Sequence, residues 1–150
     1  MKHILLDSFL LGLLSIPART AEAIAISEWA TDCLSAGHKI YIPEVIDYEL
    51  RRELLRAGKV RSVSKLGVLK AVLRYLPITT PVMLRAADLW ASSRKSGFPT
   101  GDPKKLDIDV ILSAQALTLP EPPSTIIVAT SNVSHIARFA PADLWSNISP

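Results

Sequence analysis

The sequence contains a single cysteine, Cys33, and only three histidines among its 150 residues. One thiol cannot form an intramolecular disulfide, and no Cys/His cluster has the spacing of a zinc site. We therefore expect Cys33 to be a small core residue of a cytoplasmic protein. His3, His38 and His135 lie far apart along the chain, and we expect each of them to be structural.

Several signatures of common enzyme classes are also missing. The sequence has no P-loop, no dinucleotide-binding fingerprint and no Gly-x-Ser-x-Gly elbow, so nucleotide binding and serine hydrolysis lose their usual support. The apolar stretch near the N-terminus superficially resembles a secretory signal. Asp7 interrupts that stretch, however, and residues 9–16 are too few to span a bilayer, which takes ~20 residues. We therefore expect no signal peptide and no membrane segment.

The length and composition fit one globular domain over residues 1–150. An apolar content of 49% is enough to bury a core without disulfides or a structural metal. The mean hydropathy of +0.27 is high for a small monomer, which favours apolar surface that another protein or a second copy covers. We therefore expect a homodimer or a complex with a partner protein.

Apolar periodicity predicts alternating strands and helices. Strands are expected at residues 4–6, 39–42, 78–80, 125–129 and 144–145. Helices are expected at about residues 21–36, 46–54, 63–73, 81–90 and 109–116, with a short one capped by Ser131-Asn132. Gly37 and Gly58 are expected to end two of the helices, and residues 97–105 to form a loop. This alternation predicts a three-layer α/β domain, in which helices flank a central parallel sheet of four or five strands.

Three carboxylates follow this pattern at junctions between strands and helices. Asp7 ends the first expected strand, Glu49 lies in the helix after the second, and Asp109 opens a helix rich in small residues. Each acid also has a structural reading: Asp7 could cap a helix that begins near Ser8, and Glu49 could pair with Arg52. Ligand crevices of parallel sheets lie beyond the carboxyl ends of the strands. Three anions gathered there would raise their own pKa values unless a cation lies among them, which predicts a metal-dependent phosphodiesterase.

The basic residues are concentrated in one part of the chain. The net charge is +3, and eight Lys and Arg residues lie between Arg51 and Arg74 with Glu53 as the only acid. This stretch is compatible with a polyanionic partner, and its alternative is a solvated helix face.

Four short blocks in order resemble those of PIN-domain ribonucleases, most closely the VapC-type toxins of toxin-antitoxin pairs. They span nearly the whole chain: Ile4-Leu5-Leu6-Asp7-Ser8, Ile42-Pro43 through Glu49-Leu50-Arg51, Asp109 with Leu112, Ser113, Ala114 and Ala116, and Val128-Ala129-Thr130-Ser131-Asn132 through His135-Ile136. Asn132 stands where many PIN nucleases have a fourth acid, which weakens a second metal position. Ser113 and Gln115 also depart slightly from the third block.

The resemblance implies an Mg²⁺- or Mn²⁺-dependent endoribonuclease with an RNA substrate and an antitoxin partner. Asp7, Glu49 and Asp109 would hold the metal, and Asn132 would complete the catalytic set. Asp107, Ser8 and Ser131 are possible additions to this set. Arg52, Arg56 and Arg61 would hold the RNA backbone without reading its bases.

Three alternatives remain open at this stage. A housekeeping PIN nuclease in RNA processing would have the same site but no inhibitory partner. A PIN-like binding module would keep the fold without turnover, although the presence of three carboxylates argues against it. A phosphorelay receiver domain has a similar order of elements but needs an acidic pair after its first strand, where this chain has Asp7-Ser8.

Overall fold

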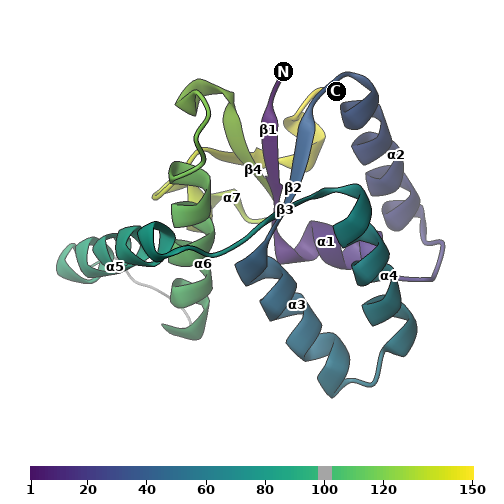
Figure 1. Ribbon diagram of the computed structural model, residues 1–150, viewed down its shortest axis with the longest axis horizontal. Helices are drawn as coiled ribbons and strands as arrows, with labels where there is room; N and C mark the ends of the chain where they lie inside the picture. The colour runs from purple at the N-terminus through teal and green to yellow at the C-terminus, as the bar shows by residue number, and fades with distance from the viewer. Residues whose placement is uncertain (98–102) are drawn as a thin grey trace.

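The computed structural model describes residues 1–97 and 103–150, in which one parallel sheet of five strands has the order β3-β2-β1-β4-β5 (Figure 1). Every neighbouring pair of strands is parallel. The strands are β1 (His3–Leu6), β2 (Lys39–Pro43), β3 (Arg74–Leu76), β4 (Ile126–Thr130) and β5 (Ala142–Leu144). The expected α/β class and parallel sheet are confirmed.

Helices cover the sheet on both sides. In Figure 1, α1, α2 and α4 lie on one side of the sheet and α5 and α6 on the other, while α3 and α4 extend together away from it. The helices are α1 (Ser8–Ser15), α2 (Ala21–Ser35), α3 (Glu44–Arg56), α4 (Val60–Val72), α5 (Thr80–Lys95), α6 (Pro103–Leu117) and α7 (Val133–Ala137). Short 3-10 turns at Pro123–Thr125 and Trp145–Asn147 complete the described elements.

The central strand is the most deeply buried element. All four residues of β1 are buried, as expected for a strand between two helical layers. Side chains from α1, α2, α3 and α6 pack with it into the main core, and Cys33 is a fully buried member of that core, as predicted. A smaller cluster joins α5 to α6 through Val82, Ala86, Leu106 and Val110.

Two glycines end helices as the sequence predicts. Gly37 and Gly58 have φ angles of +90° and +67°, a region that residues with a Cβ rarely adopt. Each follows the last turn of its helix, α2 or α3, and turns the chain back toward the next element.

Three expected elements were wrong in position. The last strand, expected at residues 144–145, is Ala142–Leu144, and Trp145 begins a short 3-10 turn instead. The strand predicted at residues 78–80 lies earlier, at Arg74–Leu76, because the Thr79 hydroxyl accepts a hydrogen bond from the Val82 amide (3.4 Å) and so caps α5. Asp109 does not open its helix, since α6 already begins at Pro103, a residue that suits a first helical turn. Of the loop expected at residues 97–105, residues 98–102 lie outside the described part, and residues 103–105 are helical.

Within residues 1–97 and 103–150, no helix has both the length and the apolar character needed to cross a membrane.

Candidate functional site

Asp7 lies where two central strands end together. Because β1 and β4 are parallel and Leu6 is in register with Ala129, the chain leaves both strands at the same edge of the sheet. The Asp7 carboxylate accepts a hydrogen bond from the Leu10 amide on Oδ1 (3.0 Å) and from the Ser131 amide on Oδ2 (3.2 Å). The expected helix cap and the expected site residue are therefore the same side chain, which these two bonds hold in place.

The three carboxylates of the sequence analysis line one cavity of about 220 Å³, which we call the carboxylate pocket. The end of β1, the middle of α3 and the middle of α6 supply one acid each. The pocket also takes polar side chains from the turn after β4, and apolar side chains lie beside them. Its predicted members are Asp7, Ser8, Glu49, Asp109, Ser131 and Asn132. The structure thus brings together residues that lie more than a hundred positions apart in the chain.

The environment of the pocket disfavours negative charge on two of the acids. Burial raises the pKa of Glu49, and the charge of Asp7 acts in the same direction, whereas the Ser8 hydroxyl lowers it. Burial also raises the pKa of Asp109 to about 6, with smaller contributions from Glu49 and Asp7. The repulsion between acids that the sequence predicted is present, but desolvation is the larger cause.

The sequence analysis did not predict three cationic or titratable side chains that lie at the site. Lys105 and His135 line the carboxylate pocket, and the charge of Arg138 lowers the pKa of Asp109. The His135 ring is 47% exposed, and its Nδ1 lies 3.9 Å from Oδ2 of Asp109, so this histidine belongs to the site rather than to the core. Lys105 precedes Asp109 by four residues, one helical turn, and an earlier predicted start of that helix would have revealed it.

Asp107 does not line the carboxylate pocket. It is exposed and lies along two other cavities, which α6 forms with α3 and with α5. Successive residues of a helix point about 100° apart, so a residue two positions from Asp109 faces nearly the opposite way. Asp107, the possible additional carboxylate, therefore lies outside the pocket that the other three carboxylates line.

The predicted RNA-binding arginines lie at different distances from the pocket. Arg52 follows Glu49 by less than one helical turn, and its Cζ lies 5.0 Å from the centre of the Tyr48 ring. Arg56 lies ~10 Å along α3 from Glu49 and pairs with Glu53 at 2.9 Å. Arg61 is exposed in the first turn of α4, at the end of the α3–α4 pair that points away from the sheet (Figure 1).

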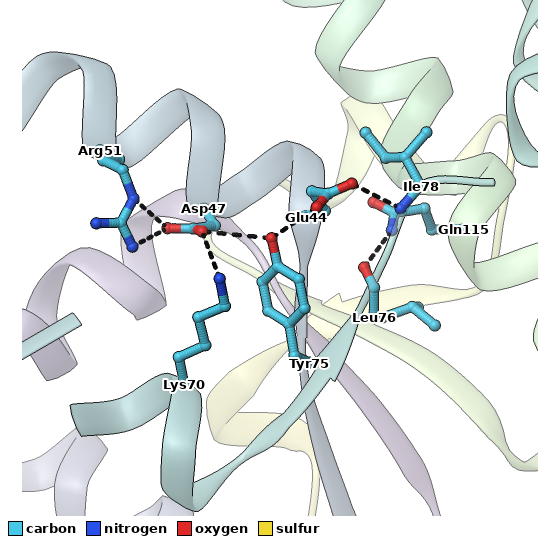
Figure 2. A network of polar contacts seen from close by, with 8 residues as sticks. All are labelled: Glu44, Asp47, Arg51, Lys70, Tyr75, Leu76, Ile78 and Gln115. Carbon is cyan, nitrogen blue, oxygen red and sulfur yellow. Dashed lines mark hydrogen bonds and ion pairs between the residues drawn. The ribbon is translucent and has the colours of Figure 1, made fainter. Parts of the chain in front are cut away.

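A polar network holds the base of α3 (Figure 2). The Asp47 side chain is only 9% exposed and pairs with Arg51 at 2.9 Å and with Lys70 at 3.9 Å. The Tyr75 hydroxyl donates to Glu44 at 2.9 Å and approaches Asp47 at 3.4 Å. Burial, together with these two carboxylates, raises the pKa of Tyr75, which further favours the protonated hydroxyl that donates to Glu44.

The same network reaches α6. Glu44 also accepts from the Ile78 amide at 2.9 Å, and the Gln115 side-chain amide donates to the Leu76 carbonyl at 2.7 Å. The Gln115 side-chain carbonyl in turn accepts from the Val45 amide at 3.4 Å. These contacts fix the two helices that carry the second and third carboxylates relative to each other.

The donor atoms of the pocket suit a hard cation. In the described part of the chain, no three Asp, Glu, His or Cys side chains converge closely enough to enclose a metal ion by themselves. Mg²⁺ keeps several waters and is usually bound through one or two carboxylates, so it does not need such an enclosure. The pocket offers carboxylate, amide and hydroxyl oxygens with one imidazole, that of His135, and no thiol among its lining residues, so it fits Mg²⁺ or Mn²⁺ better than zinc.

This chain is similar to known proteins in its fold, but not detectably in its sequence. No protein-family model matches this chain, and no curated protein matches its sequence significantly. The crystal structure of VapBC2 from Rickettsia felis, bound to a DNA fragment from its promoter, contains a chain with a TM-score of 0.69 at 15% identity. That match covers 95% of this chain and 98% of the other.

Two further solved structures give similar values. FitAcB from Neisseria gonorrhoeae matches with a TM-score of 0.64 at 18% identity over 97% of this chain and 99% of that chain. VapBC-1 from nontypeable Haemophilus influenzae matches with a TM-score of 0.63 at 14% identity over 96% and 98% of the two chains. At such identities the likeness establishes the fold, and the expected PIN-like fold is confirmed.

Proposed function

We propose that this chain is an Mg²⁺- or Mn²⁺-dependent endoribonuclease and the toxin of a toxin-antitoxin pair. The observation that carries the proposal is the carboxylate pocket, where Asp7, Glu49 and Asp109 meet at the carboxyl edge of the sheet with Asn132 beside them. The near full-length likeness to chains of VapBC and FitAcB complexes supports the toxin assignment.

The pocket residues have distinct roles in this proposal. Asp7, Glu49 and Asp109 would hold the metal ion together with water molecules, and the bound ion would lower the pKa of a water molecule and offset charge on the phosphate. Asn132 and Ser131 orient water or substrate through hydrogen bonds. Lys105 and Arg138 place positive charge beside the acids, where a phosphate group of the RNA would lie.

The partner in this proposal is an antitoxin, in line with the complexes that the similar chains form. A buried group of anions attracts Arg or Lys, so a partner that inserts a basic side chain into the carboxylate pocket would inhibit the enzyme. The high mean hydropathy of +0.27 is also consistent with a homodimer.

Cleavage of single-stranded RNA by the purified protein tests the catalytic part of the proposal. We expect cleavage with Mg²⁺ and none with EDTA, and we expect Asp7→Asn to reduce the rate by orders of magnitude. The asparagine still offers an oxygen to the Leu10 amide and so keeps the helix cap. Asp88→Asn, the same change at an exposed residue of α5, is the matched control and should cleave normally.

Growth of cells that express the chain tests the toxin part. Expression of the wild type should arrest growth, and co-expression of the product of the neighbouring gene should restore it. Cleavage in vitro without growth arrest or binding to that product would instead favour the housekeeping nuclease.

A further inference from the structure

We propose that a second cavity, beside the carboxylate pocket, binds a nucleobase of the RNA next to the cleaved phosphodiester bond. This inference depends on the proposed ribonuclease function and names a subsite for its substrate. The cavity, here called the α3–α6 cavity, has a volume of about 580 Å³. That volume lies within the roughly 300–1,000 Å³ typical of small-molecule sites. Its apolar wall consists of Val45, Ile78, Met83, Ile108 and Ile111.

The α3–α6 cavity and the carboxylate pocket share a wall. Ile108 lines both of them, and the same two helices serve both. From α3, Glu49 lines the carboxylate pocket and the adjacent Tyr48 lines the α3–α6 cavity. From α6, Asp109 lines the carboxylate pocket and Asp107 lines the α3–α6 cavity. A nucleotide whose phosphate lies at the carboxylates can therefore place a neighbouring base in the α3–α6 cavity.

The polar side chains of the cavity suit a nucleotide better than an apolar peptide. Tyr48 is 56% exposed, and the Arg52 guanidinium stacks against its ring with Cζ 5.0 Å from the ring centre. Exposed aromatic rings bind single-stranded nucleic acid by stacking on bases, and a neighbouring arginine contacts phosphate or adds a cation–π interaction. Tyr48 and Arg52 thus provide both contacts at the mouth of one cavity.

The acids of the cavity predict which bases it prefers. Both carboxylate oxygens of Glu44 already accept hydrogen bonds, from the Tyr75 hydroxyl and the Ile78 amide (Figure 2). Asp107 is the other acid of the cavity, and its side chain is exposed there. A carboxylate only accepts hydrogen bonds, so it favours the exocyclic amino groups of adenine, cytosine and guanine over uracil, which offers one ring N–H between two carbonyl oxygens.

A thermodynamic cycle between Tyr48 and the base tests the proposal. The probes are copies of one RNA that the wild type cleaves, in which each nucleotide near the cleaved bond is replaced in turn by an abasic ribose. We expect one position at which the abasic change lowers kcat/KM about tenfold for the wild type but hardly at all for Tyr48→Ala. Tyr48→Phe keeps the ring and should keep the abasic penalty of the wild type at that position. Leu55→Ala, at another exposed residue of α3, is the control.

The base preference gives a second readout. Asp107→Asn replaces an acceptor by a group that also donates, so it should raise the rate with uracil relative to cytosine at the position that the cycle identifies. Tyr48→Ala could instead disturb the adjacent Glu49. The rates with the intact and the abasic RNAs would then fall equally, and the abasic penalty would stay as large as that of the wild type.

Each contrary result has a clear meaning. If the wild type cleaves RNA and the abasic penalties are identical in the wild type and Tyr48→Ala, the base site is wrong while the ribonuclease remains. If Tyr48→Ala instead lowers the mass in sedimentation or abolishes binding of the neighbouring gene product, with unchanged abasic penalties, a protein covers the cavity and the base site is again overturned. If the wild type cleaves no RNA, the proposed function fails with it.

Discussion

The main-chain amide of Ser131 donates a hydrogen bond of 3.2 Å to the side chain of Asp7, although 124 positions separate the two residues in the sequence. The bond joins the ends of β1 and β4 and orients the first carboxylate of the pocket. Because the other oxygen of Asp7 caps α1, this side chain contributes to both the stability and the proposed chemistry of the chain.

Substitutions of Asp7 should separate these two contributions. Asp7→Ala loses both hydrogen bonds and should lower the free energy of unfolding by roughly 1–2 kcal/mol, whereas Asp7→Asn keeps the bond from the Leu10 amide and should lower it less. Both variants should lose RNA cleavage. Urea unfolding of the three proteins in EDTA measures the difference, and equal stability of Asp7→Ala and the wild type would contradict the structural role.

Asp109 should destabilise the metal-free protein at neutral pH. Its pKa is raised from 3.8 to about 6 in the folded state, mainly by burial, so the folded protein binds a proton more tightly than the unfolded chain between these values. Stability is therefore lost as the pH rises from about 4 to about 6, and Asp109→Asn removes that loss. We expect the variant to be more stable than the wild type by on the order of 2 kcal/mol at pH 7.5 in EDTA.

The pH dependence is the control for that prediction. Near pH 4 the folded state carries the proton and a large part of the unfolded chains carries it as well, so most of the advantage of Asp109→Asn should be lost. Thermal unfolding at both pH values decides the matter, since an advantage that does not change with pH would have another cause.

Arg52 and Arg56 should differ in RNA binding although both are exposed arginines of α3. Arg52 lies beside the carboxylate pocket, whereas Arg56 lies farther along the helix and pairs with Glu53. Arg52→Gln should therefore reduce the slope of log K against log salt by about 0.7, the value for one lost contact with a single strand. Arg56→Gln should leave the slope nearly unchanged, and equal effects of the two changes would contradict this difference.

The elements that the sequence predicted well have strong local signals. The apolar run that ends at Asp7 is a central strand buried on both faces, and Gly37 and Gly58 end helices through their backbone geometry. The edge strand β3 has only three residues, beginning with the exposed Arg74, so it carries no apolar pattern that distinguishes it from the end of a helix.

The missed parts of the site depend on tertiary structure. Lys105 reaches the carboxylate pocket because α6 begins earlier than its apolar pattern indicates, and His135 does so because α7 follows β4 at the same sheet edge as Asp7. Helix geometry likewise places Arg56 beside Glu53, with which it forms an ion pair. It also turns Asp107 away from the three acids of the carboxylate pocket. Composition alone does not show which charged residues lie at the pocket and which do not.

The dependence of RNA cleavage on Mg²⁺, measured for the wild type and Glu49→Gln, tests the central claim most directly. The wild-type rate should be zero in EDTA, return on addition of Mg²⁺ and saturate with it, because the ion would bind to the carboxylate pocket through carboxylates and water molecules. Glu49→Gln has nearly the same shape without the charge and should be slower by about 100-fold or more, while its thermal unfolding shows an intact fold. Cleavage that continues in EDTA, or a wild-type rate for Glu49→Gln, would contradict the account.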